Sequence, residues 1–175
     1  MIDRLPPQNL DSEQAVLGSI LIDRDAIIEV ADFLHVEDFY RQAHGRIFGA
    51  MLELFEHREP IDVVTVAEAL ERAGDLETVG GASYLSTLGS DTPTAVHVVQ
   101  YGRIVERKAV LRRLIGAAGK IAAIGYEDGS DIQESIDRAE AELFAVSQRR
   151  SGDSFSALRT LLHNCLLYTS PSPRD

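Results

Sequence analysis

One stretch of helix-forming residues, Tyr101 to Gly129, constrains the fold of this chain most strongly (YGRIVERKAVLRRLIGAAGKIAAIGYEDG). Helical spacing continues upstream, so the sequence predicts a single helix over about residues 95–124. About thirty residues at ~1.5 Å each give a rod of roughly 45 Å. Because this rod is longer than the small domain before it, the partner of its apolar residues is the main question that the sequence raises.

The apolar residues of this helix form two adjacent seams that step by three and four residues. The first seam consists of Val110, Leu114, Ala117, Ile121 and Ile124. The second, interrupted by Lys108, consists of Ile104, Leu111, Ile115, Ala118 and Ala122. After a turn at residues 128–131, the same step recurs in Ile132, Ile136, Ala139, Leu143 and Val146. The sequence therefore predicts a helical hairpin in which the returning helix covers one seam.

The other seam needs a further partner. The preceding bundle could supply it, but a rod that extends past the bundle leaves apolar surface in water. At about 25 cal/mol per Å2, exposing a whole seam forfeits several kcal/mol. We therefore expect self-association through the hairpin, with contacts from Ile104, Leu111, Leu114, Ile136 and Leu143.

Residues 1–94 are predicted to form a compact multi-helix bundle, which makes the fold class all-α. An extended arm with two prolines leads into a first helix that Asn9 or Asp11 can cap. A glycine-containing turn is expected at residues 76–82. Apolar residues at helical spacing mark further helices at residues 27–34, 47–55, 63–70 and 84–88.

The chain is therefore expected to have four parts. They are the bundle (1–94), the dimerisation hairpin (95–148), a linker with the start of a linker helix (149–162), and a non-native or disordered tail (163–175).

The composition excludes several classes of protein. The formal net charge of -11 repels phosphate backbones and argues against nucleic-acid binding by this chain alone. No apolar run approaches the roughly 18 residues of a membrane span, and the N-terminus lacks the apolar core of a signal peptide. The single cysteine, Cys165, excludes an internal disulfide, so a cytoplasmic location is the default.

No convincing catalytic, cofactor or metal site is present in the sequence. The GAAGK segment at residues 116–120 has the wrong spacing for a phosphate loop and lies inside a predicted helix, where small residues would favour close packing. The five scattered histidines are interpreted as surface or capping residues, and acidic pairs such as Glu37 and Asp38 as solvated helix ends. The VEDFY segment at residues 36–40 is interpreted as an aromatic plug and not as a catalytic carboxylate.

A basic stripe on the long helix is the one functional candidate that the residues themselves indicate. It can be a solvated helix face or a docking face for an acidic or helical partner. Its members are Arg103, Arg107, Lys108, Arg112, Arg113 and Lys120.

Five strings in series resemble the N-terminal domain of DnaB-type replicative DNA helicases, over about residues 5–148. They are RLPPQNLDSEQAVLGSILID, EDFYRQAHGRIFGAMLEL, DVVTVAEAL, VGGASYLSTL and YGRIVERKAVLRRLI. The resemblance implies a helical bundle and a hairpin that pairs subunits, so that a hexameric ring carries a collar built as a trimer of dimers. It also implies that the collar recruits the C-terminal domain of primase and helps to accept a helicase loader.

Carried onto this chain, the resemblance places the primase-facing surface at Asp11, Tyr84, Arg112, Ile115 and Ile121. Plain packing within the hairpin is the competing interpretation of the two isoleucines.

The chain departs from the family in three respects. His97 stands where Asn is frequent, and Gly102 stands where Ala is usual and costs about 0.5–1 kcal/mol in a helix. The RecA-like motor, which would bind ATP, Mg2+ and DNA in the intact parent, is missing, so we expect no ATPase activity. Since HNCLLYTSPSPRD does not resemble the family's continuation, we expect a truncated fragment with a foreign or misread tail. A small dimeric all-α DNA-binding or regulatory protein is the alternative.

Overall fold

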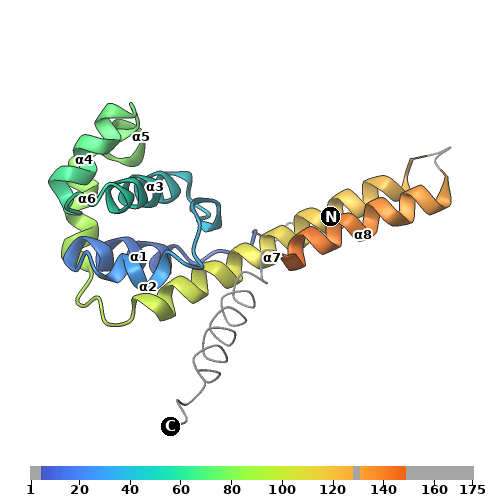
Figure 1. Cartoon of the computed structure of the whole chain (residues 1–175), viewed down its shortest axis with the longest axis horizontal. Helices are drawn as coiled ribbons and strands as arrows, with labels where there is room; N and C mark the ends of the chain where they lie inside the picture. The colour runs from blue at the N-terminus through green and yellow to red at the C-terminus, as the bar shows by residue number, and fades with distance from the viewer. Residues whose placement is uncertain (1–4, 128–130, 149–175) are drawn as a thin grey trace, which may run out of the picture. The chain divides into compact units, whose positions relative to one another are not determined.

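The computed structural model describes residues 5–127 and 131–148, and these residues form helices and connecting turns without any strand (Figure 1). The all-α fold class is therefore confirmed. One compact unit, the bundle unit, ends at Arg113, and a second, the hairpin unit, begins at Leu114 inside helix α7. The predicted division after residue 94 stays a prediction, and the parts predicted at residues 149–162 and 163–175 lie outside the described residues.

The first helix forms where the sequence predicts it, and the second is shorter than predicted, because it ends at Val30 and not at residue 34. The carbonyl oxygen of the Asn9 side chain accepts a hydrogen bond from the backbone N–H of Ser12 at 2.9 Å and so caps α1 (Leu10–Ile22), whereas Asp11 lies within the first turn. Helix α2 (Ala26–Val30) follows directly. The core-facing residues of α1 are Val16, Leu17 and Ile20, all fully buried.

The central helix of the bundle is α3 (Gln42–Glu56), which follows the short 3-10 helix η1 (Val36–Asp38). Ile47, Phe48 and Met51 are fully buried along it, and the Phe39 ring lies 5.1 Å from the Phe48 ring. The aromatic plug predicted for residues 36–40 is thus confirmed at Phe39, whereas Val36 and Tyr40 are exposed.

The end of α3 contains a strained residue. Arg58 has a φ of 59°, in the left-handed region that favours glycine. We expect Arg58→Gly to raise the free energy of unfolding by about 1 kcal/mol, because the steric cost of a Cβ in this conformation disappears. Urea denaturation followed by circular dichroism measures the change. A loss of stability would show instead that contacts of the Arg58 side chain stabilise the fold by more than the left-handed backbone conformation destabilises it.

The next helices correct one prediction. Asp62 caps α4 (Val63–Arg72) through hydrogen bonds to the backbone of Val64 and Thr65, as the sequence predicts. The expected turn at residues 76–82 and short helix at 84–88 are instead a short helix α5 (Leu76–Val79) and a longer α6 (Gly81–Asp91). The chain turns at Gly80, which has a φ of 108°, and the next helix begins at once.

Helix α1 packs against α6, and α3 against α4 (Figure 1). Helices α1 and α6 approach each other closely at Gly18, where a Cβ would overlap the Thr92 side chain and the Leu88 carbonyl oxygen. We expect Gly18→Ala to lower the free energy of unfolding by about 1–3 kcal/mol through overpacking. Gly49→Ala is the matched control, since its Cβ would make only an ordinary contact, and it should stabilise α3 by about 0.5–1 kcal/mol. Equal effects of the two substitutions in a thermal melt would contradict this view of Gly18.

Gly102 is explained by packing in the same way. It is buried, and a Cβ would lie 3.1 Å from the Phe33 ring and 3.2 Å from a Val30 methyl group. Gly102 therefore permits close contact between α7 and the segment around α2, although a glycine at this position costs helix propensity.

Helix α7 (Val98–Gly125) and helix α8 (Ile132–Gln148) form the predicted hairpin, and α8 runs back alongside the end of α7 (Figure 1). Ala117 and Ile124 are buried, and Lys120 Nζ lies 2.9 Å from Glu142 Oε2 across the two helices. Arg138 pairs with Glu127 at 2.7 Å, and this hydrogen bond raises the pKa of the arginine. The prediction that the returning helix covers one seam of the long helix is thus confirmed for the C-terminal half of that seam.

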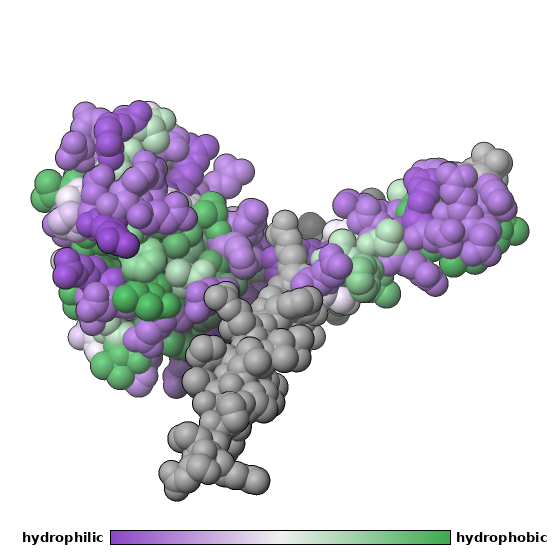
Figure 2. Space-filling view, in the orientation of Figure 1, coloured by the Kyte–Doolittle hydropathy of each residue, from purple (hydrophilic) through white to green (hydrophobic). Residues whose placement is uncertain are grey.

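Much apolar surface on the hairpin unit stays in contact with solvent. Polar residues cover most of its near face in Figure 2, with apolar residues along the edge. Of the five residues predicted to meet a second copy, Leu114, Ile136 and Leu143 lie in this unit and are between 46% and 53% exposed. The other two, Ile104 and Leu111, lie on the part of α7 that belongs to the bundle unit and are 37% and 40% exposed. Leu114 belongs to the same seam as the buried Ala117 and Ile124, so the cover of that seam is incomplete.

The GAAGK segment lies in the middle of α7, as predicted, with its backbone in a helix. The close packing proposed for its glycines is not found among residues 5–127 and 131–148, where a Cβ at Gly116 or Gly119 would meet nothing within 4 Å. None of the helices in residues 5–127 and 131–148 combines the length and apolar character that a membrane span requires.

Candidate protein-docking site

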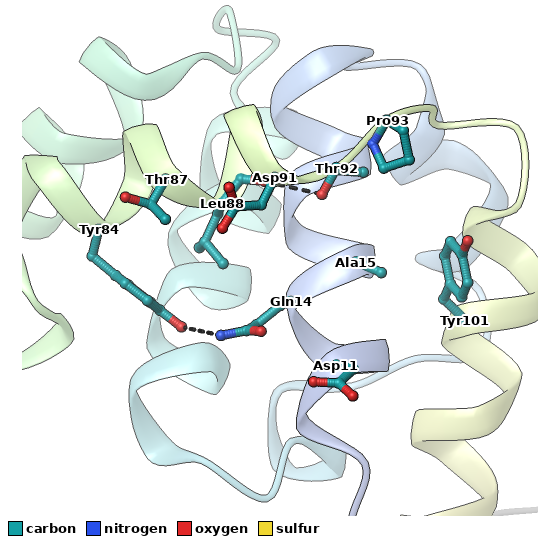
Figure 3. Close-up of a pocket in the computed structure, with 10 residues that line it drawn as sticks. All are labelled: Asp11, Gln14, Ala15, Tyr84, Thr87, Leu88, Asp91, Thr92, Pro93 and Tyr101. Atoms are coloured by element: carbon teal, nitrogen blue, oxygen red, sulfur yellow. Dashed lines mark hydrogen bonds between the residues drawn. The ribbon is translucent and has the colours of Figure 1, made fainter.

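A groove in the bundle unit, here called the Tyr84 groove, brings together residues from α1, α6 and the start of α7. It encloses about 230 Å3. Its lining consists of Asp11, Gln14, Ala15, Tyr84, Thr87, Leu88, Asp91, Thr92, Pro93 and Tyr101. In Figure 3, Tyr84 reaches from α6 toward Gln14 on α1, while Tyr101 stands on α7 beside Ala15. Two residues predicted as primase-facing, Asp11 and Tyr84, therefore line one groove although 73 positions separate them (84 − 11).

The hydroxyl group of Tyr84 is the most connected atom of this groove. It lies 2.7 Å from His44 Nε2 and accepts hydrogen bonds from Gln14 Nε2 at 3.1 Å and from an Arg41 terminal nitrogen at 3.4 Å. The Arg41 guanidinium carbon also lies 5.3 Å from the centroid of the Tyr84 ring. The half-buried ring is thus held by contacts from both α1 and α3.

Behind Tyr84 lies a buried polar pair, Glu13 and His44. Both side chains are at most 2% exposed, and Glu13 Oε2 lies 2.7 Å from His44 Nδ1. Glu13 also accepts hydrogen bonds from the backbone N–H groups of Tyr40 at 2.7 Å and Arg41 at 3.4 Å. Since a carboxylate only accepts, we assign a proton to Nδ1, which leaves Nε2 facing the Tyr84 hydroxyl.

The interpretation of His44 as a surface or capping residue is therefore wrong. His44 follows the core register of α3, three, four and seven positions before Ile47, Phe48 and Met51, and a polar partner on α1 makes its burial possible. His57, His35 and His97 are exposed, and His57 caps α3 through the Glu53 carbonyl at 2.9 Å. His163 lies outside the described residues.

Two carboxylates, Asp11 and Asp91, stand at the rim of the Tyr84 groove. Both residues are exposed, and within the described part of the chain neither carboxylate pairs with another side chain. Leu88 and Ala15 supply apolar surface between them, and Tyr101 and Pro93 add an aromatic and a rigid wall. Such a mixture of acidic rim and apolar floor suits contact with another protein.

Arg112 is engaged within the bundle unit. Its terminal nitrogens donate to the carbonyl oxygens of Pro7 at 2.7 Å and Asp38 at 2.5 Å, and its guanidinium carbon lies 5.5 Å from the Tyr40 ring centroid. Burial lowers the pKa of this guanidinium from its ordinary value. Arg112 thus ties the N-terminal arm to α7, and its predicted role toward primase stays a prediction.

The interpretation of Asp38 as a solvated helix end is wrong. The residue is only 1% exposed and accepts hydrogen bonds from Arg113 at 2.6 Å and from the backbone N–H of His35 at 3.0 Å. Ion pairing with Arg113 stabilises the buried carboxylate.

The members of the basic stripe do not form one uniform docking face. Arg112 and Arg113 are bound inside the bundle unit, Lys120 pairs with Glu142, and Arg103 pairs with Glu106 at 3.0 Å. Arg103 also lies over the Phe33 ring at 3.8 Å. The remaining predicted primase-facing residues lie on α7 in the hairpin unit, where Ile115 is 59% exposed and Ile121 is half-buried.

Within the described residues, no cluster of three His, Cys, Asp or Glu side chains could hold a metal ion. The Glu13 and His44 side chains are sealed from solvent, at most 2% exposed.

Comparison with known proteins identifies the family of this chain. The family model described as "DnaB-like helicase N terminal domain" matches residues 5–107. The chain is 44% identical over 160 residues to "Replicative DNA helicase DnaB" of Geobacillus stearothermophilus, which covers 91% of this chain and 35% of that protein. The Mycobacterium leprae (strain TN) protein of the same name is 45% identical over 161 residues, with coverage of 91% and 27%. The chain thus spans about a third of the length of these curated relatives.

Two solved structures are similar as well. The crystal structure of the N-terminal domain of DnaB helicase from Mycobacterium tuberculosis has a TM-score of 0.77 and 46% identity, and the match covers 81% of this chain and 99% of that one. A structure described as a DnaB-like replicative helicase and its interactions with primase has a TM-score of 0.66 and 26% identity, with coverage of 81% and 31%. Fold and sequence together lead to one assignment: this chain belongs to the DnaB-like helicase family and contains its N-terminal domain.

Proposed function

We propose that this domain assembles subunits and docks primase in a bacterial hexameric replicative helicase. The hairpin pairs two copies, and three such pairs form the collar of the ring. The intact protein works in the cytoplasm, where it unwinds duplex DNA through an ATP- and Mg2+-dependent motor domain. A helicase loader is a further partner of the collar, and DNA contacts the motor domain and the ring channel.

The observation that carries the docking proposal is the Tyr84 groove. It places Asp11, Tyr84 and the unpaired Asp91 around one apolar floor of α1 and α6. Similarity to a helicase whose structure includes interactions with primase points to primase as the partner. The alternative of a small DNA-binding protein is not favoured, because the family match accounts for most of the chain and its net charge is -11.

Titration of the full chain with the C-terminal domain of primase tests the docking proposal. We expect Tyr84→Ala to weaken binding by about tenfold or more, as loss of an aromatic anchor at an interface does. Asp11→Asn should weaken it less, because a rim charge contributes less than a buried anchor.

Tyr126→Ala is the matched control, since Tyr126 is 89% exposed at the end of α7 and lies outside the groove. Wild-type affinity in both the Tyr84→Ala and the Asp11→Asn variants would remove primase docking from this groove.

A further inference from the structure

The hydroxyl group of Tyr84 makes as many hydrogen bonds within this chain as a phenol can make. A phenol has one proton to donate and two lone pairs to accept with. With the proton of a neutral His44 assigned to Nδ1, Nε2 at 2.7 Å accepts from the hydroxyl, and Gln14 at 3.1 Å and Arg41 at 3.4 Å supply the two donors. In this assignment no site on the oxygen is left for a partner protein.

We propose that the buried Glu13–His44 pair is a positioning device for Tyr84, and that a docked protein contacts Tyr84 through an apolar side chain placed on its ring. This inference rests on the proposed docking function and adds the chemistry of the contact. Arg41 already places a cation 5.3 Å from the ring centroid, which disfavours a second cation at the same ring.

The Glu13–His44 pair can position Tyr84 because several hydrogen bonds hold the two side chains of the pair in place. Glu13 on α1 accepts from two backbone N–H groups before α3, and its remaining contact orients the His44 ring. The Tyr84 ring lies parallel to that of His44, with an interplanar angle of 3°. A half-buried tyrosine on α6 is thereby held in one orientation before its partner arrives, which lowers the entropic cost of binding.

Two substitutions of His44 separate positioning from general stability. An Asn side chain places its amide nitrogen near the position of Nδ1, so it keeps the contact with Glu13 and loses the contact with Tyr84. A Gln side chain reaches the position of Nε2, so it keeps the contact with Tyr84 and loses that with Glu13. Both remove the imidazole from the core, which makes each the control for the other.

We expect His44→Asn to weaken binding of the primase C-terminal domain by about fivefold, the net worth of one hydrogen bond, and His44→Gln to stay near wild type. Tyr84→Phe should weaken binding by about the same factor and should add nothing when combined with His44→Asn. Circular dichroism confirms that each titrated sample is folded. Equal losses in the Asn and Gln variants, or no loss in either, would overturn the positioning role.

A measurement on the wild-type chain tests the ring contact without any substitution. Saturation with the primase domain should shift the ring-carbon NMR signals of Tyr84 and leave both ring-nitrogen signals of His44 unchanged. A shift of the His44 Nε2 signal would mean that the partner competes for the hydroxyl, and would overturn the inference. Unchanged Tyr84 ring carbons, together with wild-type affinity of Tyr84→Ala, would instead remove the docking function on which the inference rests.

Discussion

Replacing Glu13 with Ala is expected to lower the free energy of unfolding of the bundle unit by about 3–5 kcal/mol, the cost of removing one partner from a buried polar pair. Three donors lose their acceptor at once: the backbone N–H groups of Tyr40 and Arg41 and the ring of His44. The site is closed, with Glu13 only 1% exposed, so water cannot easily replace the carboxylate.

Urea denaturation measures the effect, with Glu68→Ala as the control. Glu68 is an exposed glutamate on α4, and its loss should change stability by no more than about 0.5 kcal/mol. Glu13→Gln should fall between the two, because one amide oxygen can still accept from the backbone. Equal stability of the Glu13→Ala and Glu68→Ala variants would contradict the structural role of the buried pair.

The second large effect is expected on self-association. Ile136 and Leu143 lie seven residues apart on one face of α8 and are 47% and 53% exposed in the single chain. Replacing both with Glu should raise the dissociation constant of the dimer by at least about a thousandfold, since each unpaired carboxylate buried at an interface costs several kcal/mol. The fold of the single chain should hardly change, because both positions face solvent.

Ala145→Glu combined with Gln148→Glu is the charge-matched control. Both residues are exposed on the far side of α8 from Ile136 and Leu143, so they add the same charge outside the expected interface. Size-exclusion chromatography with light scattering compares the two double variants. Equal dissociation by both would mean that charge repulsion, and not loss of an apolar contact, controls association.

Much of the fold could be predicted because local signals agree with the packing. Asn9 and Asp62 each precede an apolar run and cap the helix that follows. The boundary between α5 and α6 could not be predicted so well. Adjacent glycines at positions 80 and 81 indicate a loop in the sequence, but both adopt positive φ and turn the chain within two residues.

The site was predictable only in part. The resemblance predicts Asp11 and Tyr84 as docking residues, but their meeting in one groove depends on the close approach of α1 and α6 at Gly18. The buried pair was missed although a signal existed, because Glu13 lies three and four positions before Val16 and Leu17, in the core register. A polar residue in that register requires a partner, and His44 holds the corresponding place on α3.

The contributions of Asp91 and Tyr101 to the groove could not be read from the sequence. Both flank the irregular segment between α6 and α7, and its path depends on packing between elements distant in the chain.

Sedimentation velocity of the unmodified chain, from low to high micromolar concentration, bears most directly on whether the hairpin joins two molecules. The exposed isoleucines and leucines of α7 and α8 predict a sedimentation coefficient that rises with concentration toward that of a dimer or a larger ring. A folded chain that sediments as a single molecule at every concentration would contradict an assembly role for this surface.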